Sequence, residues 1–158
     1  MIYWIMGLLG ALVIGIDQWT KYLVTSQMTV GQTLPAWKGV FELHYVRNSG
    51  MAWSMLEGAR WLFVVVTLAV LVLVIFAIRK KWLSGKAQLL STALILGGAI
   101  GNLIDRVATG EVVDMIQVTF MSFPVFNVAD CFITCGTIVL AFDLLVGDWW
   151  RKRKGESK

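Results

Sequence analysis

The run from Trp61 to Ile78 contains 18 residues without a charged side chain. At about 1.5 Å of rise per residue, a helix of this length nearly crosses a hydrocarbon core of about 30 Å. The whole chain of 158 residues is 58% hydrophobic and 15% charged, whereas soluble domains average about 45–50% apolar and about 25% charged residues. The sequence therefore predicts an integral membrane protein, organised as one domain over residues 1–158.

Three further apolar stretches have the length and character of membrane spans. We predict an α-helical integral membrane protein with four transmembrane helices, at about residues 4–24, 60–78, 88–106 and 125–147. Residues 26–58 differ, because glycine and proline interrupt them and apolar and polar residues alternate from Phe41 to Tyr45. Alternation with a period of two indicates a strand. We expect a small extracytoplasmic β-sheet segment there, between helices 1 and 2.

Small residues recur every four positions in two of the predicted spans. The first span contains Gly7, Ala11 and Gly15, and the third contains Ala93 and Gly97, followed by a further glycine at position 101. Such rows let helix backbones approach closely in lipid. We therefore expect both rows to lie at helix contacts.

Positive charge is concentrated beside two of the spans. One cluster occupies residues 79–86 and the other is the basic tail at residues 151–158. Because basic residues favour the cytoplasmic side, both clusters predict cytoplasmic anchoring, and four spans place both termini there. This pattern also accounts for the net charge of +4 and the pI of about 9.3, so we expect no nucleic-acid partner. Residues 26–58 and 107–125 then face outward together.

Cysteine and histidine offer little chemistry in this chain. Cys131 and Cys135 are four residues apart in an apolar run, and His44 is far from both in the sequence. That spacing on a helix suits a disulfide poorly, and the ligand set for zinc is incomplete. We expect two small apolar side chains, no metal and no cofactor.

Polar residues gather at the predicted outer end of the bundle, and two aspartates stand out there. Asp130 follows Asn127 at the start of the fourth span, and Asp114 precedes it in a connection that can fold back. Two adjacent carboxylates cannot easily both ionise, so one keeps its proton. The ionised member can then accept a proton from water while the protonated member donates a hydrogen bond to a peptide carbonyl. The pair predicts metal-free peptide hydrolysis.

Other interpretations of the acidic residues remain open at this point. Buried acids also serve ion relays, so a small proton or ion carrier is the alternative function, and a scaffold held together by polar contacts is another. Asp17 and Lys21 share a helix face, either as an interfacial ion pair or as part of a substrate site. Asp105 is expected to pair with its neighbour Arg106. Asp143 lies about 20 Å deeper than the outer aspartates and cannot join them.

The chain resembles the lipoprotein signal peptidase family, also called signal peptidase II, whose members are aspartic peptidases. Five segments carry the resemblance in the family's order: DQWTK (17–21), RNSGMAWS (47–54), GNLIDR (101–106), GEVVDM (110–115) and FNVAD (126–130). Each segment alone is a weak signal, but five in order within a predicted four-span protein are specific.

The resemblance implies a function and a site. It implies an aspartic endopeptidase of the bacterial plasma membrane with its site toward the outer face. Such an enzyme cleaves prolipoproteins just before a diacylglyceryl-modified cysteine, contacts membrane lipids and is inhibited by globomycin-type compounds. Asp114 and Asp130 would be catalytic. The supporting or substrate-binding residues would be Asp17, Lys21, Asn48, Asn102, Arg106 and Asn127.

We also expect the surface sheet and the short piece after Gly50 to hold the substrate, with Arg47 and Asn48 as polar contacts. A monomer is the default expectation for the oligomeric state.

Overall fold

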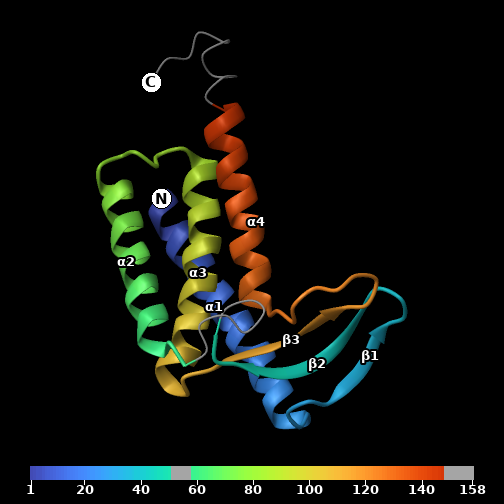
Figure 1. The fold of residues 1–158 in the computed structure, drawn as a ribbon. Coiled ribbons are helices and arrows are strands. Elements are labelled where there is room, and N and C mark those ends of the chain that lie inside the picture. Colours follow the sequence, from blue (N-terminus) through green and yellow to red (C-terminus); the bar gives the residue numbers. More distant parts are fainter. Residues whose placement is uncertain (51–57, 148–158) are drawn as a thin grey trace.

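Four helices and three strands make up the parts of the chain that the computed structural model describes, residues 1–50 and 58–147. The helices are α1 (Ile2–Gln27), α2 (Arg60–Arg79), α3 (Lys86–Ala108) and α4 (Val128–Phe142), and α4 continues as a π-helical turn, η2 (Asp143–Gly147). The strands are β1 (Thr33–Trp37), β2 (Phe41–Asn48) and β3 (Val112–Val118). The helices lie side by side, and the strands form a sheet at the end of the bundle away from the α2–α3 connection (Figure 1).

The four described helices are long and apolar enough to cross a membrane, which confirms the predicted fold class. The expected spans at 4–24, 60–78 and 88–106 lie within α1, α2 and α3, and each helix extends beyond its predicted limits by one to three residues at one or both ends. The fourth helix begins at Val128 rather than at residue 125. Its start is delayed because Phe126 exchanges backbone hydrogen bonds of 2.8 and 3.0 Å with Ile116 of β3. The basic tail at 151–158 lies outside the described residues.

The sheet contains one strand that the sequence did not predict. Its order is β1-β2-β3, with antiparallel neighbours, so β3 joins it from the connection between α3 and α4. Val46 of β2 pairs with Asp114 of β3. The sheet packs on the end of α1, where Tyr45 is buried with Val24 and Met115. Asp114 therefore lies on a paired strand rather than on a loose connection.

Helix α3 packs against the other three helices, and its glycines allow the closest approaches. A Cβ atom added at Gly97 would lie 2.8 Å from the side chain of Val13 on α1. One added at Gly98 would lie 2.6 Å from the carbonyl oxygen of Ala129 on α4. The expected row in the third span is thus at a helix contact, together with the neighbouring Gly98.

The expectation that the small residues Gly7, Ala11 and Gly15 of α1 lie at a helix contact is wrong. A Cβ atom at Gly7 or Gly15 would meet nothing within 4 Å. The face of α1 that contacts the bundle instead presents Val13 and Asp17, which are both buried. Spacing alone could not distinguish these two faces, because most positions of α1 are apolar or small.

Replacing Gly98 by alanine should lower stability, since the new methyl group meets the backbone of α4, which cannot easily move, as well as the side chain of Ile133. We expect a loss of about 1–3 kcal/mol. The matched control is Gly15→Ala, where space is open and alanine should raise helix stability by about 0.5–1 kcal/mol. Thermal unfolding in detergent measures both. Equal unfolding temperatures for the two variants would contradict this packing.

Candidate active site

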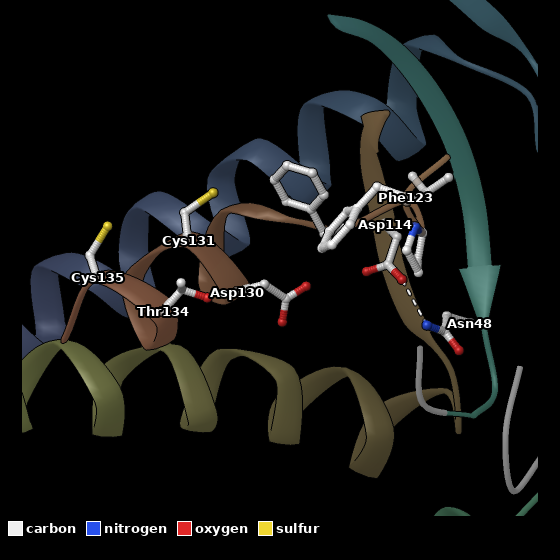
Figure 2. Close-up of a pocket in the computed structure, with 10 residues that line it drawn as sticks. Asn48, Asp114, Phe123, Asp130, Cys131, Thr134 and Cys135 are labelled. Atoms are coloured by element: carbon white, nitrogen blue, oxygen red, sulfur yellow. Dashed lines mark hydrogen bonds between the residues drawn. The ribbon is translucent and has the colours of Figure 1, made fainter. Parts of the chain in front are cut away.

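Asp114 and Asp130 approach the same space from two different elements. Asp114 comes from the third position of β3 and Asp130 from the first turn of α4. Both line a cavity of about 530 Å³, and their carboxyl groups point toward it from opposite sides (Figure 2). The predicted convergence of the two aspartates is therefore present in the fold.

Asn127 connects the two carboxyl groups directly. Its backbone N–H donates to Asp130 Oδ2 over 3.1 Å, and its side-chain Nδ2 donates to Asp114 Oδ1 over 2.7 Å. Its Oδ1 accepts from the backbone N–H of Asp130 over 3.0 Å, which completes a capping box at the start of α4. Asn127 is fully buried, with 0% of its surface exposed. One residue therefore starts the helix and sets the positions of both carboxyl groups.

Two further amides hold the remaining carboxyl oxygens. Asn48 Nδ2 donates to Asp114 Oδ2 over 2.9 Å, a bond drawn in Figure 2. Asn102 Nδ2 donates to Asp130 Oδ1 over 2.9 Å. Each of the four carboxyl oxygens thus accepts a hydrogen bond from an asparagine, which offsets part of the cost of burying them.

Burial governs the protonation of Asp114, whose surface is 3% exposed. The pKa of Asp114 is raised to about 6, chiefly by burial and also by the charge of Asp130, against the opposing effects of the Asn48 and Asn127 hydrogen bonds and the charge of Lys21. A carboxyl group with this pKa can hold or release a proton near neutral pH. Beside a second carboxylate, it can act as a proton donor.

Lys21 lies behind the carboxyl pair, and its surface is only 4% exposed. Its ammonium group lies 2.8 Å from Asp17 Oδ2 and 2.9 Å from Asp105 Oδ2, and it donates to Asn102 Oδ1 over 2.9 Å. The predicted proximity of Asp17 and Lys21 is confirmed. Because Asn102 also holds Asp130, Lys21 supports the aspartate pair through that amide.

The predicted pairing of two neighbouring polar residues is wrong. Asp105 forms its ion pair with Lys21, rather than with Arg106. The guanidinium of Arg106 instead lies 4.9 Å from the ring centre of Phe63 and donates weakly to the carbonyl oxygen of Gly50 over 3.4 Å. Adjacent residues on a helix point about 100° apart, and here this turns Asp105 toward α1 and Arg106 toward α2.

Arg47 and Asn48 face different hollows, because successive side chains of a strand alternate. Asn48 lines the cavity beside the aspartates. Arg47 lines a second hollow of about 330 Å³ together with Lys21, donates to the hydroxyl of Tyr45 over 3.1 Å and lies 3.7 Å from Glu111. The two residues thus line different hollows, and the expectation that both contact the substrate stays a prediction. The short piece after Gly50 lies outside the described residues.

Beyond the polar end, the cavity is apolar and runs along α4 into the membrane-spanning region. Phe123, Pro124, Val125 and Phe126 form its wall from the connection before α4, and Cys131, Thr134 and Cys135 form it from α4 itself. Cys131 and Cys135 contribute free thiols to this wall and follow Asp130 along α4, to its left in Figure 2. The arrangement suits an apolar ligand whose polar, reacting end reaches the two carboxyl groups.

Within the described ranges, no group of three or more His, Cys, Asp and Glu is arranged to hold a metal ion. Amide N–H groups of asparagines donate one hydrogen bond to each carboxyl oxygen of Asp114 and Asp130. This donor set suits a carboxylic acid and carboxylate pair that acts directly on water.

Sequence reasoning missed two supporting features. Asp105 accepts from the side chain of Gln18 over 2.9 Å and from the backbone N–H of Val113 over 3.2 Å, so it joins α3 to both α1 and β3. The second feature is the capping box of Asn127 and Asp130. Its signal was visible in the sequence, since an Asn followed three residues later by an acidic residue and then an apolar run resembles a helix start.

The Asp114 carboxyl should titrate near pH 6, well above an ordinary aspartate. Its protonated form should therefore be present below that pH and be lost as the pH rises through about 6. Infrared difference spectroscopy can follow the C=O stretch of the protonated group, with Asp114→Asn used to assign the band and Asp143→Asn as a matched control that retains it. A band lost already near pH 4 would contradict this environment.

Comparisons with known proteins agree with this geometry. Residues 9–146 match the model of the family described as "Signal peptidase (SPase) II". Curated proteins named "Lipoprotein signal peptidase" are similar along most of the chain. That of Geobacillus thermodenitrificans is 47% identical over 84% of both chains, and that of Enterococcus faecalis is 41% identical over 89% of this chain and 88% of the relative. That of Halalkalibacterium halodurans is 39% identical over 99% of both.

Solved structures show the same fold. Two structures of a bacterial membrane enzyme, at 2.3 and 1.9 Å resolution, superimpose with TM-scores of 0.84 and 0.82 at 33% sequence identity. Each covers 89% of this chain, which in turn covers 87% and 92% of theirs. The family match, the full-length relatives and the shared fold together lead to one conclusion. This chain is a member of the signal peptidase II family and a multi-pass bacterial membrane protein.

Proposed function

We propose that this protein removes signal peptides from prolipoproteins, with Asp114 and Asp130 as its catalytic pair. Membership of the signal peptidase II family supplies the reaction. The observation that carries the catalytic assignment is the double hydrogen bond of Asn127, which holds one oxygen of each carboxyl group beside a shared cavity.

Asp114 and Asp130 would use the mechanism of an aspartic peptidase, in which one carboxyl group is protonated and the other is ionised. The ionised group takes a proton from a water molecule, whose oxygen then attacks the scissile carbonyl carbon. The protonated group donates a hydrogen bond to the carbonyl oxygen as negative charge develops there. When the C–N bond breaks, a carboxyl proton passes to the leaving amine. No covalent intermediate and no metal is required.

The cavity explains how a lipid-linked substrate reaches this pair. A prolipoprotein whose cysteine carries a diacylglyceryl group presents apolar chains beside its scissile bond, and the cavity wall along α4 is apolar and aromatic. Burying that apolar surface fixes the depth of the bond at the outer end of α4. In this position, the carbonyl group just before the modified cysteine lies beside Asp114 and Asp130, where it is cleaved. Globomycin-type inhibitors would occupy the same cavity.

The supporting residues have distinct roles in this proposal. Asn48, Asn102 and Asn127 orient the carboxyl groups through direct hydrogen bonds. Asp17 and Lys21 act one step further away, through Asn102 and the start of α4. Arg106 contributes positive charge near Asp114 and Asp130, and it links α3 to Gly50, two residues after the end of β2.

The relay function of a proton or ion carrier is not favoured. The chain's relatives along nearly its whole length are peptidases by name.

Asp114→Asn and Asp130→Asn should each abolish cleavage of a diacylated prolipoprotein. We expect a fall in kcat of at least about 100-fold for each, because each removes a group that handles a proton in the reaction. The matched control is Asp143→Asn, which changes an acidic residue at the opposite end of α4 and should retain activity. The assay measures released signal peptide with purified protein in detergent or lipid. Substantial activity in either active-site variant would remove that residue from the pair.

We also propose that both termini and the basic α2–α3 connection face the cytoplasm, with the sheet and the aspartate pair toward the outer face, in a single monomeric domain over residues 1–158. A reporter inserted after Gly39, in the β1–β2 turn, should be extracytoplasmic, and one inserted after Ser84, in the α2–α3 connection, should be cytoplasmic. The reverse pattern would overturn this orientation.

A further inference from the structure

The residue that precedes each active-site aspartate is held by a carboxylate from another helix. The backbone N–H of Ala129, just before Asp130, donates to Asp17 Oδ1 over 3.0 Å. The backbone N–H of Val113, just before Asp114, donates to Asp105 Oδ2 over 3.2 Å. Asp17 belongs to α1 and Asp105 to α3, so each half of the catalytic pair has its own carboxylate support.

Lys21 and Gln18 join these two supports to each other. The Lys21 ammonium lies 2.8 Å from Asp17 and 2.9 Å from Asp105. Gln18 Nε2 donates to the same two carboxylates, over 3.2 Å to Asp17 and 2.9 Å to Asp105. We call the group of Asp17, Gln18, Lys21 and Asp105 the Lys21 cluster. It forms a continuous hydrogen-bonded link from the backbone beside Asp130 to the backbone beside Asp114.

We propose that Asp105 is a positioning residue of the reaction, which sets the separation of the two catalytic carboxyl groups by linking the start of β3 to the Lys21 cluster. This inference rests on the proposed function. It adds a residue that was expected only to form a local ion pair, and it assigns that residue to the geometry of Asp114.

The chemistry of the cluster favours a geometric role over a purely stabilising one. Two carboxylates and one ammonium are buried together, at 0%, 9% and 4% exposure for Asp17, Asp105 and Lys21, which leaves one negative charge unbalanced within the cluster. Burying ions is costly, and well-packed apolar side chains commonly hold helices together at least as well. What apolar side chains cannot do is accept hydrogen bonds from two backbone N–H groups and fix the distance between them.

The test is the substitution Asp105→Asn in the full-length protein. Asparagine keeps the size of the side chain and an oxygen for the Val113 N–H, but it loses the charge that attracts Lys21. We expect kcat for a diacylated prolipoprotein to fall about tenfold or more, with KM changed less than about threefold, because the cavity that binds substrate is intact while the carboxyl pair is misplaced. Asp143→Asn, an acid-to-amide change at the far end of the bundle, should keep kcat within about twofold.

The titration of Asp114 gives a second readout that a merely structural role would not move. Asp114 faces Asp130 from α4, Lys21 from α1 and Arg106 from α3, beside the amides of Asn48 and Asn127. Removing the charge of Asp105 leaves the positive charge of Lys21 less balanced. The infrared midpoint of Asp114 should therefore move to lower pH in Asp105→Asn and stay in place in Asp143→Asn.

The outcomes separate this inference from the proposed function. Full kcat and an unchanged Asp114 midpoint in Asp105→Asn, with Asp114→Asn inactive, would overturn the role of Asp105 alone. Activity surviving in Asp114→Asn would overturn the catalytic pair itself. If Asp105→Asn does not fold, Gln18→Met tests the same link with no change of charge. A fall in kcat of about threefold or more supports the proposal, and an unchanged kcat contradicts it.

Discussion

The buried asparagine at position 127 is the contact on which the site depends. Two carboxyl groups close together at a membrane boundary repel one another and lose solvation, so a fold that brings them together must provide donors for their oxygens. Asn127 provides one donor to each, while its own carbonyl oxygen caps α4. The start of the fourth helix, the backbone pairing of Phe126 with Ile116, and the position of Asp114 on β3 are parts of the same arrangement.

The helical bundle serves this arrangement by bringing distant segments to one end. Glycines of α3 allow α1 and α4 to approach on two of its faces, and Asn102 and Asp105 then extend from α3 toward the residues that support each carboxyl group. Helix α3 thus makes polar contacts at the end of the bundle that carries the sheet and apolar contacts along the rest of its length. In the proposed function, the apolar cavity beside α4 would hold the lipid-linked part of the substrate, and its polar end would hold the peptide bond.

Much of this could be predicted from the sequence, because its signals are local. The apolar runs predicted the four spans, and the i, i+4 spacing predicted the contact of Asp17 with Lys21. Because acidic residues are costly to bury, their positions beside apolar runs singled out Asp114 and Asp130. Features that depend on long-range pairing were missed. Strand β3 is stabilised by β2, more than 60 residues earlier in the chain, and the partner of Asp105 lies on α1. The wrong glycine row in α1 has the same cause, since the face that meets α3 is decided by packing.

The central claim is that Asp114 and Asp130 interact as a pair, and the most direct test is the titration of Asp114 in the Asp130→Asn variant. The negative charge of Asp130 helps to raise the pKa of Asp114, which is about 6 in the intact site. Removing that charge should move the infrared midpoint of the Asp114 carboxyl to lower pH, although its burial is unchanged. A midpoint that stays where it was would show that the two carboxyl groups do not sense each other, and would contradict the account.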